Sequence, residues 1–102
     1  MDINLTEQED RLVIAFIGNL DNMSAPEAEQ TLQPVYKRKD CDFLIDCSQL
    51  NYISSKGLRL LITLYKHFRD CGHRVFIMNM NKNVKEVLHQ SGFLTLYEEV
   101  TA

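Results

Sequence analysis

The sequence is poor in the residues that build phosphate-binding loops and disulfide frameworks. It holds only four glycines in 102 residues, and neither Gly-x-Gly-x-x-Gly nor Gly-x-x-x-x-Gly-Lys-Ser/Thr occurs. A doubly wound nucleotide-binding fold or a P-loop is therefore not predicted. The three cysteines form no Cys-x-x-Cys pair, and their odd number leaves one unpaired in any disulfide scheme. We expect reduced thiols, no metal site and no cofactor.

Long apolar runs and an excess of positive charge are also missing. The apolar runs are far shorter than the about 20 residues that a membrane-spanning helix needs, and the N-terminus lacks the basic start and apolar core of a signal peptide. The net charge of −3, with both signs mixed, offers no basic surface for nucleic acid or for an anionic membrane. We expect a cytoplasmic protein with neither nucleic acid nor membrane as a partner.

Catalytic constellations cannot be placed either. The sequence shows no specific carboxylate pair, Ser–His–acid arrangement or metal-ligand spacing, so we predict that the protein is not an enzyme. Among the three histidines, His67 falls on the polar face of a predicted helix, where we expect it to be solvated.

The length and composition that are present suit one globular unit. A chain of 102 residues with 45% hydrophobic and 25% charged residues is ordinary for a domain that builds its own core. No linker, repeat or low-complexity segment interrupts it. We expect a single domain covering residues 1–102.

The central stretch from Phe43 to Gly72 organises the chain. A short apolar run, Phe43–Ile45, predicts a buried strand, and a polar connection follows at Ser48–Asn51. From Lys56 onward the pattern becomes that of an amphipathic helix ending near Gly72, with an apolar arc wide enough to lie on a sheet.

Two serines, Ser54 and Ser55, stand where this helix begins. Backbone N–H groups at a helix start lack partners, so one serine is expected as the N-cap. The other is either a second local hydrogen-bonding group or a regulated hydroxyl, and the residue types leave both interpretations open. Gly57 in the first turn costs a helix about 1 kcal/mol relative to Ala. Its presence indicates either that a partner backbone or a phosphate approaches closely, or that packing within the chain leaves no room for a side chain. In the first case Gly57→Ala should leave folding intact.

Strands and helices alternate along the rest of the chain. We predict strands at Ile3–Thr6 and Arg11–Ile17, then a loop whose Asp21 is either a capping residue or part of a site near Ser55. The remaining elements are a helix from the candidate N-cap Ser24 to Val35 or Tyr36, kinked or loosened in its last turn by Pro34, then a strand at Arg74–Met80, a helix at Val84–Gln90 and a last strand involving Leu94, Leu96, Tyr97 and Val100. This alternation predicts a mixed α/β sheet with right-handed crossovers.

The segment Asp46-Cys-Ser-Gln-Leu-Asn-Tyr-Ile-Ser-Ser-Lys-Gly-Leu58 resembles the signature of STAS domains, specifically of the bacterial anti-sigma-factor antagonists. Gly18-Asn-Leu-Asp21 and the closing Val-x-x-x-Leu-x-x-Ser-Gly-Phe pattern are similar to that family too, so the resemblance spans nearly the whole chain. It implies the STAS fold, a mixed four- to five-stranded sheet with helices packed on one side in a β–α superhelical winding.

The resemblance also implies a function. Such a protein would bind an anti-sigma factor of the histidine-kinase-like ATPase class and so release a sigma factor. Ser55 falls on the serine that the kinase phosphorylates, which switches binding off, and a PP2C-type phosphatase would be a second partner. Two positions depart from the pattern: Ser54 stands in place of the usual Asp, and Lys56 in place of a second hydroxyl.

The resemblance implies a partner-binding site around the start of the helix. Within that site, Tyr52, Ile53 and Leu58 could equally belong to the core. The candidate residues are Asp21, Tyr52, Ile53, Ser54, Ser55, Lys56, Gly57 and Leu58. Other STAS proteins brace ATP-driven lipid-transport complexes, act as scaffold or sensory modules, or form the cytoplasmic domain of anion transporters. These are alternatives that need no phosphorylation.

Overall fold

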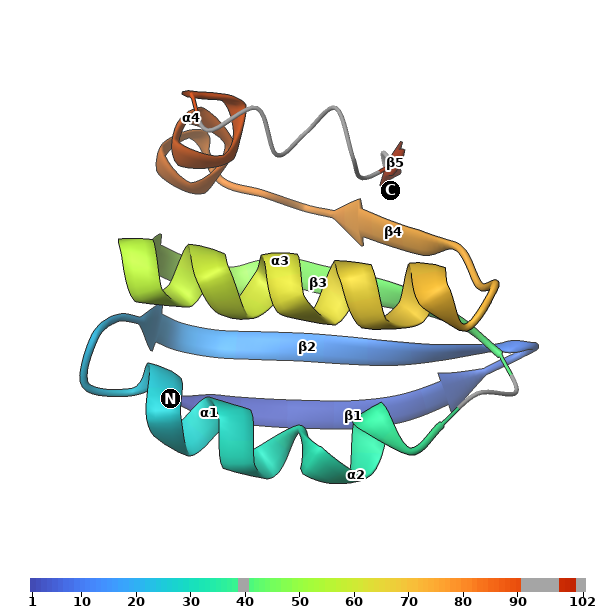
Figure 1. Ribbon diagram of the computed structural model, residues 1–102. Coiled ribbons are helices and arrows are strands. Elements are labelled where there is room, and N and C mark those ends of the chain that lie inside the picture. The colour runs from blue at the N-terminus through green and yellow to red at the C-terminus, as the bar shows by residue number, and fades with distance from the viewer. Residues whose placement is uncertain (39–40, 91–97, 101–102) are drawn as a thin grey trace.

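The computed structural model describes residues 1–38, 41–90 and 98–100, which form a layer of helices over a mixed sheet (Figure 1). The strands stand in the order β1-β2-β3-β4-β5, with β1 antiparallel to β2 and all other neighbours parallel. The elements are β1 (Asp2–Gln8), β2 (Arg11–Leu20), α1 (Ala25–Thr31), α2 (Gln33–Tyr36), β3 (Asp42–Ile53), α3 (Ser55–Asp70), β4 (Val75–Met78), α4 (Lys82–Gln90) and β5 (Glu98–Val100). This confirms the predicted mixed α/β fold.

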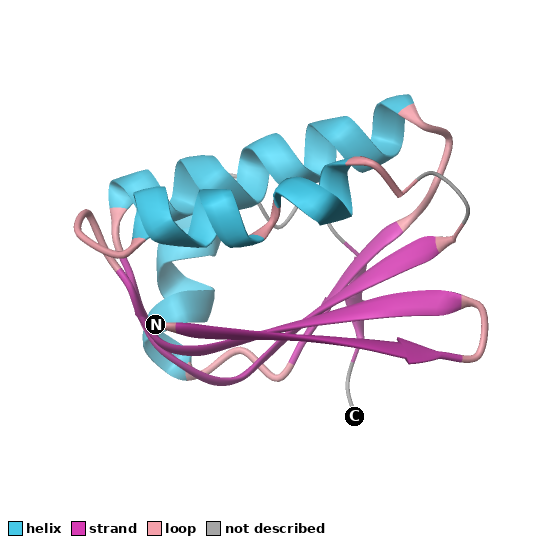
Figure 2. Ribbon diagram, turned by 90° about the horizontal axis from the view of Figure 1, so that it is seen from below, coloured by secondary structure: helices cyan, strands magenta, loops and turns pink. Residues whose placement is uncertain are grey.

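The helices α1, α2 and α3 lie over one face of the sheet (Figure 2). α4 lies beyond the carboxyl end of β4 (Figure 1). Its start is tied to β3, because the Asn81 side chain donates to the Leu50 carbonyl at 2.9 Å and accepts from the Val84 N–H at 2.8 Å. The helix therefore begins at Lys82, two residues before its predicted start. The predicted last-strand residues Leu94, Leu96 and Tyr97 lie outside the described residues.

The two central strands are longer than the sequence predicts. β2 continues past Ile17 to Leu20, and the expected polar connection at Ser48–Asn51 is part of β3. Leu50 and Ile53 are buried in the core, but two register shifts between the strands interrupt the regular alternation of inward and outward residues. Because a bulge of this kind breaks the two-residue alternation, the end of the strand cannot be recognised from that alternation in the sequence.

The core fills the space between sheet and helices. Phe43 of β3 and Phe68 of α3 are both fully buried, and their rings stack with centroids 3.5 Å apart and planes 5° apart. Such a pair adds to the free energy gained from burial alone. Together with the buried Leu60, Leu61 and Leu64, this pair holds α3 along the sheet.

The helix predicted from Ser24 to Tyr36 is divided in two at Leu32, which separates α1 from α2. Pro34 is the second residue of α2, and it has no N–H to bond the carbonyl of Gln30. The predicted disturbance of the helix near Pro34 is confirmed, as a break between two short helices. The shorter segments let the chain bend over the sheet while Leu32 and Val35 stay buried.

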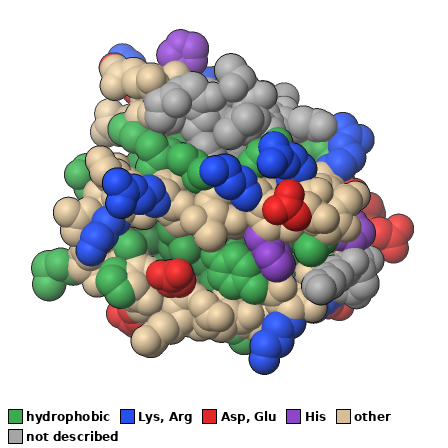
Figure 3. Space-filling view, viewed as in Figure 1, with side chains coloured by type: hydrophobic (Ala, Val, Ile, Leu, Met, Phe, Trp, Pro, Cys, Tyr) green, Lys and Arg blue, Asp and Glu red, His purple; other side chains and the backbone are tan. Residues whose placement is uncertain are grey.

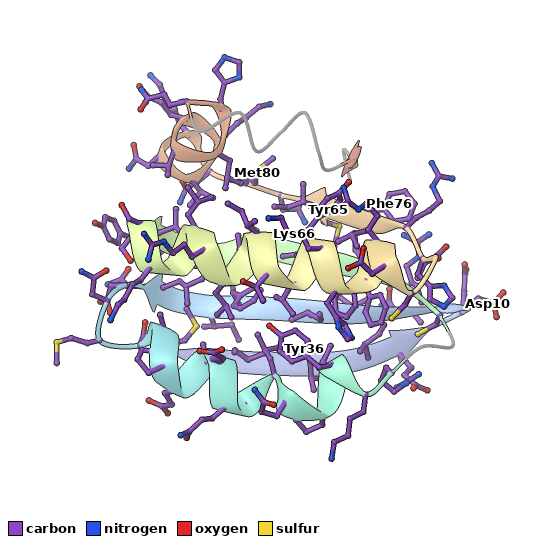
Figure 4. All side chains as sticks on the ribbon, in the orientation of Figure 1. Asp10, Tyr36, Tyr65, Lys66, Phe76 and Met80 are labelled. Atoms are coloured by element: carbon purple, nitrogen blue, oxygen red, sulfur yellow. The ribbon has the colours of Figure 1, made fainter. Side chains whose placement is uncertain are left out.

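His67 is not solvated, contrary to the prediction. Its Nε2 lies 2.6 Å from the Tyr36 carbonyl oxygen, and its ring meets the Tyr36 ring edge-on with centroids 5.0 Å apart. Figure 4 shows Tyr36 between α2 and α3. His67 therefore joins α3 to the end of α2, a contact between residues 31 positions apart that a helical wheel does not reveal.

The cysteines are free thiols. Cys47 is buried in β3, and this burial, with the charge of Asp46 added, raises its pKa to about 12. Within residues 1–38, 41–90 and 98–100, no helix has both the length and the apolar character needed to cross a membrane, and no group of His, Cys, Asp or Glu is arranged to hold a metal ion.

Candidate functional site

The start of α3 lies at the edge of the sheet where β2 and β3 end. Leu20 and Ile53, the last residues of these strands, are paired in the sheet. The Ser54 N–H donates to the Leu20 carbonyl at 2.9 Å, and the chain then turns directly from extended backbone at Ser54 into the helix. In Figure 1 the starts of α1 and α3 lie at this same end of the molecule.

The two serines have different roles in the structure. Ser54 is the N-cap of α3, since its Oγ accepts a hydrogen bond from the Gly57 N–H at 3.2 Å and the residue is half-buried. Ser55 is the first residue of the helix and is exposed. The interpretation in which one serine caps the helix is confirmed, and the capping residue is Ser54. The hydroxyl that a second protein can reach is that of Ser55.

Gly57 is a packing requirement of the fold. It is buried, and a Cβ at this position would lie 2.5 Å from the Leu20 carbonyl oxygen and 2.8 Å from the Leu20 Cγ. The expectation that Gly57→Ala leaves folding intact is therefore wrong. The close approach that the glycine permits is to β2 of the same chain, which is 37 positions away in the sequence.

Asp21 organises the connection between β2 and α1. Its Oδ1 accepts from the N–H groups of Met23 at 3.0 Å and Ser24 at 2.9 Å, and these hydrogen bonds, led by the one from Ser24, lower the pKa of the carboxyl group. Ser24 stands at the N-cap position of α1, as predicted, but its hydroxyl donates to the Asn19 carbonyl at 2.7 Å and accepts no hydrogen bond from the helix. The hydrogen bonds to its carboxylate bear out Asp21 as a residue that orders the loop before α1, and its place in a partner site stays a prediction.

We predict that Asp21→Ala lowers the melting temperature and removes part of its dependence on acid. The native pKa of Asp21 lies below its ordinary value of 3.8, so its stabilising effect is present above that pH and is lost as the pH falls through the native pKa. Thermal melts of the wild type and Asp21→Ala between pH 2 and pH 6 should converge at the acid end. Curves that stay parallel would show that the carboxylate has no such role.

The other candidate residues are divided between surface and core. Ile53 is 3% exposed and is a core residue, and Leu58 is half-buried and packs against the core. Tyr52 is 51% exposed, and Lys56 is exposed as well. The accessible part of the predicted site is therefore Tyr52, Ser55 and Lys56.

Met23 is a surface residue that the sequence analysis missed. Its side chain is 90% exposed, and among the described residues the other exposed large hydrophobics, Leu5 at 43% and Tyr52 at 51%, are much less so. Met23 lies in the β2–α1 connection and Tyr52 at the end of β3, so both lie at the edge where α3 begins. The sequence did hold a signal for it. Met23 is a large apolar residue among the polar loop residues Asp21, Asn22 and Ser24, where it does not contribute to a core.

A shallow groove runs between α1 and α3 beside Ser55. It has a volume of about 230 Å³ and is lined by Ala25, Pro26, Glu29, Lys56, Arg59, Leu60 and Thr63. Figure 3 shows Lys and Arg side chains gathered over α3 on this face of the molecule. The site as a whole is a mixed polar and apolar surface in which Lys56 and Arg59 form a positively charged wall of the groove. Its lining residues include no cluster of acid, base and nucleophile.

Comparison with known proteins agrees with this arrangement of a mixed sheet and a helix start at its edge. Residues 2–101 match the family model of the STAS domain, and the chain belongs to that family. The putative anti-sigma factor antagonist BtrV of Bordetella bronchiseptica is 25% identical over 97 residues, covering 95% of this chain and 84% of BtrV. Membership in this family supports a regulatory role without catalysis.

Solved structures share the fold. An anti-sigma-factor antagonist (STAS) domain protein from Planctomyces limnophilus has a TM-score of 0.90 at 17% identity, covering 100% of this chain and 92% of that one. Unphosphorylated SpoIIAA has a TM-score of 0.81 at 16% identity, with coverage of 99% and 88%, and the Bacillus protein is also known in its phosphorylated form. The murine anion transporter Slc26a9 matches with a TM-score of 0.79 at 12% identity over 95% of this chain but only 17% of its own length.

Proposed function

We propose that this protein is an anti-sigma-factor antagonist that binds an anti-sigma factor of the histidine-kinase-like ATPase class and is switched off by phosphorylation of Ser55. The observation that carries the proposal is the exposed Ser55 at the start of α3, with two exposed apolar side chains, Tyr52 and Met23, at the same edge of the molecule. The relative BtrV, whose name describes an anti-sigma factor antagonist, supports it.

The exposed apolar side chains give the partner its anchors. Large side chains that a partner buries fully contribute most of the binding free energy of a protein interface. Tyr52 and Met23 are exposed in the free protein, so their burial by a partner is a net gain, whereas Ile53 is already in the core.

A phosphate on Ser55 would be compatible with the fold and incompatible with the complex. At the start of a helix a negative charge is locally favourable. At a packed interface the same phosphate brings a charge of about −1.5 to −2 that must lose its hydration or meet like charge. Ser54 is the poorer substrate for phosphorylation, because its hydroxyl caps the helix and the residue is half-buried. A PP2C-type phosphatase would return the protein to its binding form.

The proposal is tested with purified anti-sigma factors of this class from the same organism. The unmodified chain is expected to form a stoichiometric complex with one of them. Addition of ATP should then transfer a single phosphate, which peptide mapping by mass spectrometry places on Ser55. The Ser55→Ala variant should accept none, and Ser54→Ala should still accept one. A phosphate on Ser54, or the absence of any complex, would refute the proposal.

A second candidate is a STAS subunit that braces a transport complex without phosphorylation. The likeness to part of Slc26a9 and the Ser54 that replaces the usual Asp favour it. In that case the protein would copurify with a transporter ATPase and permease. The association would be the same for Ser55→Ala and Ser55→Asp, whereas an antagonist distinguishes these variants.

A further inference from the structure

The helix α3 is basic in a chain that is acidic overall. It carries Lys56, Arg59, Lys66 and Arg69 against the single acid Asp70, a net charge of +3, so the rest of a chain with net charge −3 carries −6. All four basic residues are exposed. An approaching acidic surface is therefore attracted to α3 and repelled by the remainder of the molecule.

Two of these cations stand on the wall of the groove between α1 and α3. Lys56 and Arg59 face Glu29 across it, and Ala25 and Leu60, both buried, form an apolar floor. No ion pair links Lys56 or Arg59 to another residue of the described part of the chain. By contrast, the Nη2 of Arg69 lies 4.0 Å from the Oδ1 of Asp70, and the Arg69 guanidinium lies over the Tyr65 ring.

We propose that this groove is the docking site for an acidic segment of the partner protein, whose carboxylates pair with Lys56 and Arg59. The inference rests on the proposed function and identifies the chemistry of the partner. Charge complementarity favours this site, because unpaired cations and an apolar floor lie together in the groove next to the first turn of α3. Complementary charges of this kind raise the association rate and select the partner.

The same cations are within reach of a phosphate on Ser55. Ser55 and Arg59 are four residues apart on one helix, so their Cβ atoms are neighbours at roughly 5–6 Å. Arg binds phosphate through two parallel hydrogen bonds. Phosphorylation would therefore occupy the Arg59 guanidinium within the chain and remove the cation that the partner's carboxylate needs.

The first test measures binding of the anti-sigma factor that the wild type binds, as a function of salt. Lys56→Gln/Arg59→Gln should lower the association rate about tenfold at low ionic strength and weaken its dependence on salt. Lys66→Gln is the matched control, since it removes an exposed charge from α3 outside the groove (Figure 4). Its effect should stay within about twofold.

The outcomes separate the two levels of the proposal. An equal effect of Lys66→Gln, or none of the double variant, overturns the groove while the proposed function stands. A wild type that binds no anti-sigma factor overturns the proposed function and this inference with it. Unfolding curves that coincide with that of the wild type show that the variants are folded.

The second test needs no partner. Phosphoserine is incorporated at position 55, and its phosphorus resonance is followed by NMR as a function of pH. Pairing with Arg59 stabilises the dianion and lowers the second pKa below its ordinary value of about 6. Arg59→Gln should bring that pKa back up, and Lys66→Gln should leave it in place. A phosphate pKa that Arg59→Gln does not change overturns the pairing within the chain.

Discussion

Gly57→Ala is expected to destabilise the protein by about 2 kcal/mol. The new methyl group would lie 2.5 Å from the Leu20 carbonyl oxygen, 2.8 Å from the Leu20 Cγ and 3.0 Å from the Ile53 Cγ1. The carbonyl belongs to the backbone of β2 and accepts from the Ser54 N–H. Relief of the overlap therefore requires α3 to move away from the sheet. The better helix propensity of Ala offsets only about 1 kcal/mol.

The measurement is urea-induced unfolding, in which the midpoint should fall while the slope stays the same. For a domain of this size the melting temperature should drop by about 10 °C. Lys56→Ala, an exposed change in the same helical turn, is the matched control and should alter stability by about 0.5 kcal/mol or less. If Gly57→Ala unfolds at the same urea concentration as that control, the glycine is not needed for the packing of α3 on Leu20.

A phosphate on Ser55 is expected to weaken the complex with the anti-sigma factor by about a hundredfold or more. Like charges brought together in an interface cost several kcal/mol, and each 1.4 kcal/mol is a factor of about ten in affinity. Ser55→Asp brings a single negative charge and should weaken binding by about tenfold, because a carboxylate imitates the charge of a phosphate poorly. Ser55→Ala should bind like the wild type and remain bound when ATP is added.

Stability measurements separate this effect from unfolding. Ser55 is exposed and makes no contact that holds the fold, so all three forms should unfold within about 1 kcal/mol of one another, with the acidic forms favoured by their position at the helix start. Ser54→Asp is an instructive comparison, since it places a carboxylate at the N-cap and restores the residue that the family pattern has there. A complex that forms equally well with phosphorylated Ser55 would leave the bracing subunit as the better account.

The sequence by itself determined the class of fold and pointed to a candidate site. The alternation of apolar strands with amphipathic helices is a local property, and it predicted a mixed α/β sheet. A serine cap at the start of α3 and the disturbance of the helix near Pro34 were also predictable, because caps and proline act within one helical turn. The similarity of Asp46–Leu58 to the STAS signature then identified Ser55 as the residue of interest.

Only the tertiary structure decided what these residues do. The role of Gly57 depends on Leu20, and Leu20 comes close because β2 and β3 run parallel to a common edge. Met23 and Tyr52 both lie near that edge for the same reason, and the His67 ring reaches the Tyr36 carbonyl only when α2 packs beside α3. The groove with Lys56 and Arg59 exists only between α1 and α3. Contacts of this kind join distant parts of the chain, and a periodic pattern records only which face of an element is buried, never which residue lies against it.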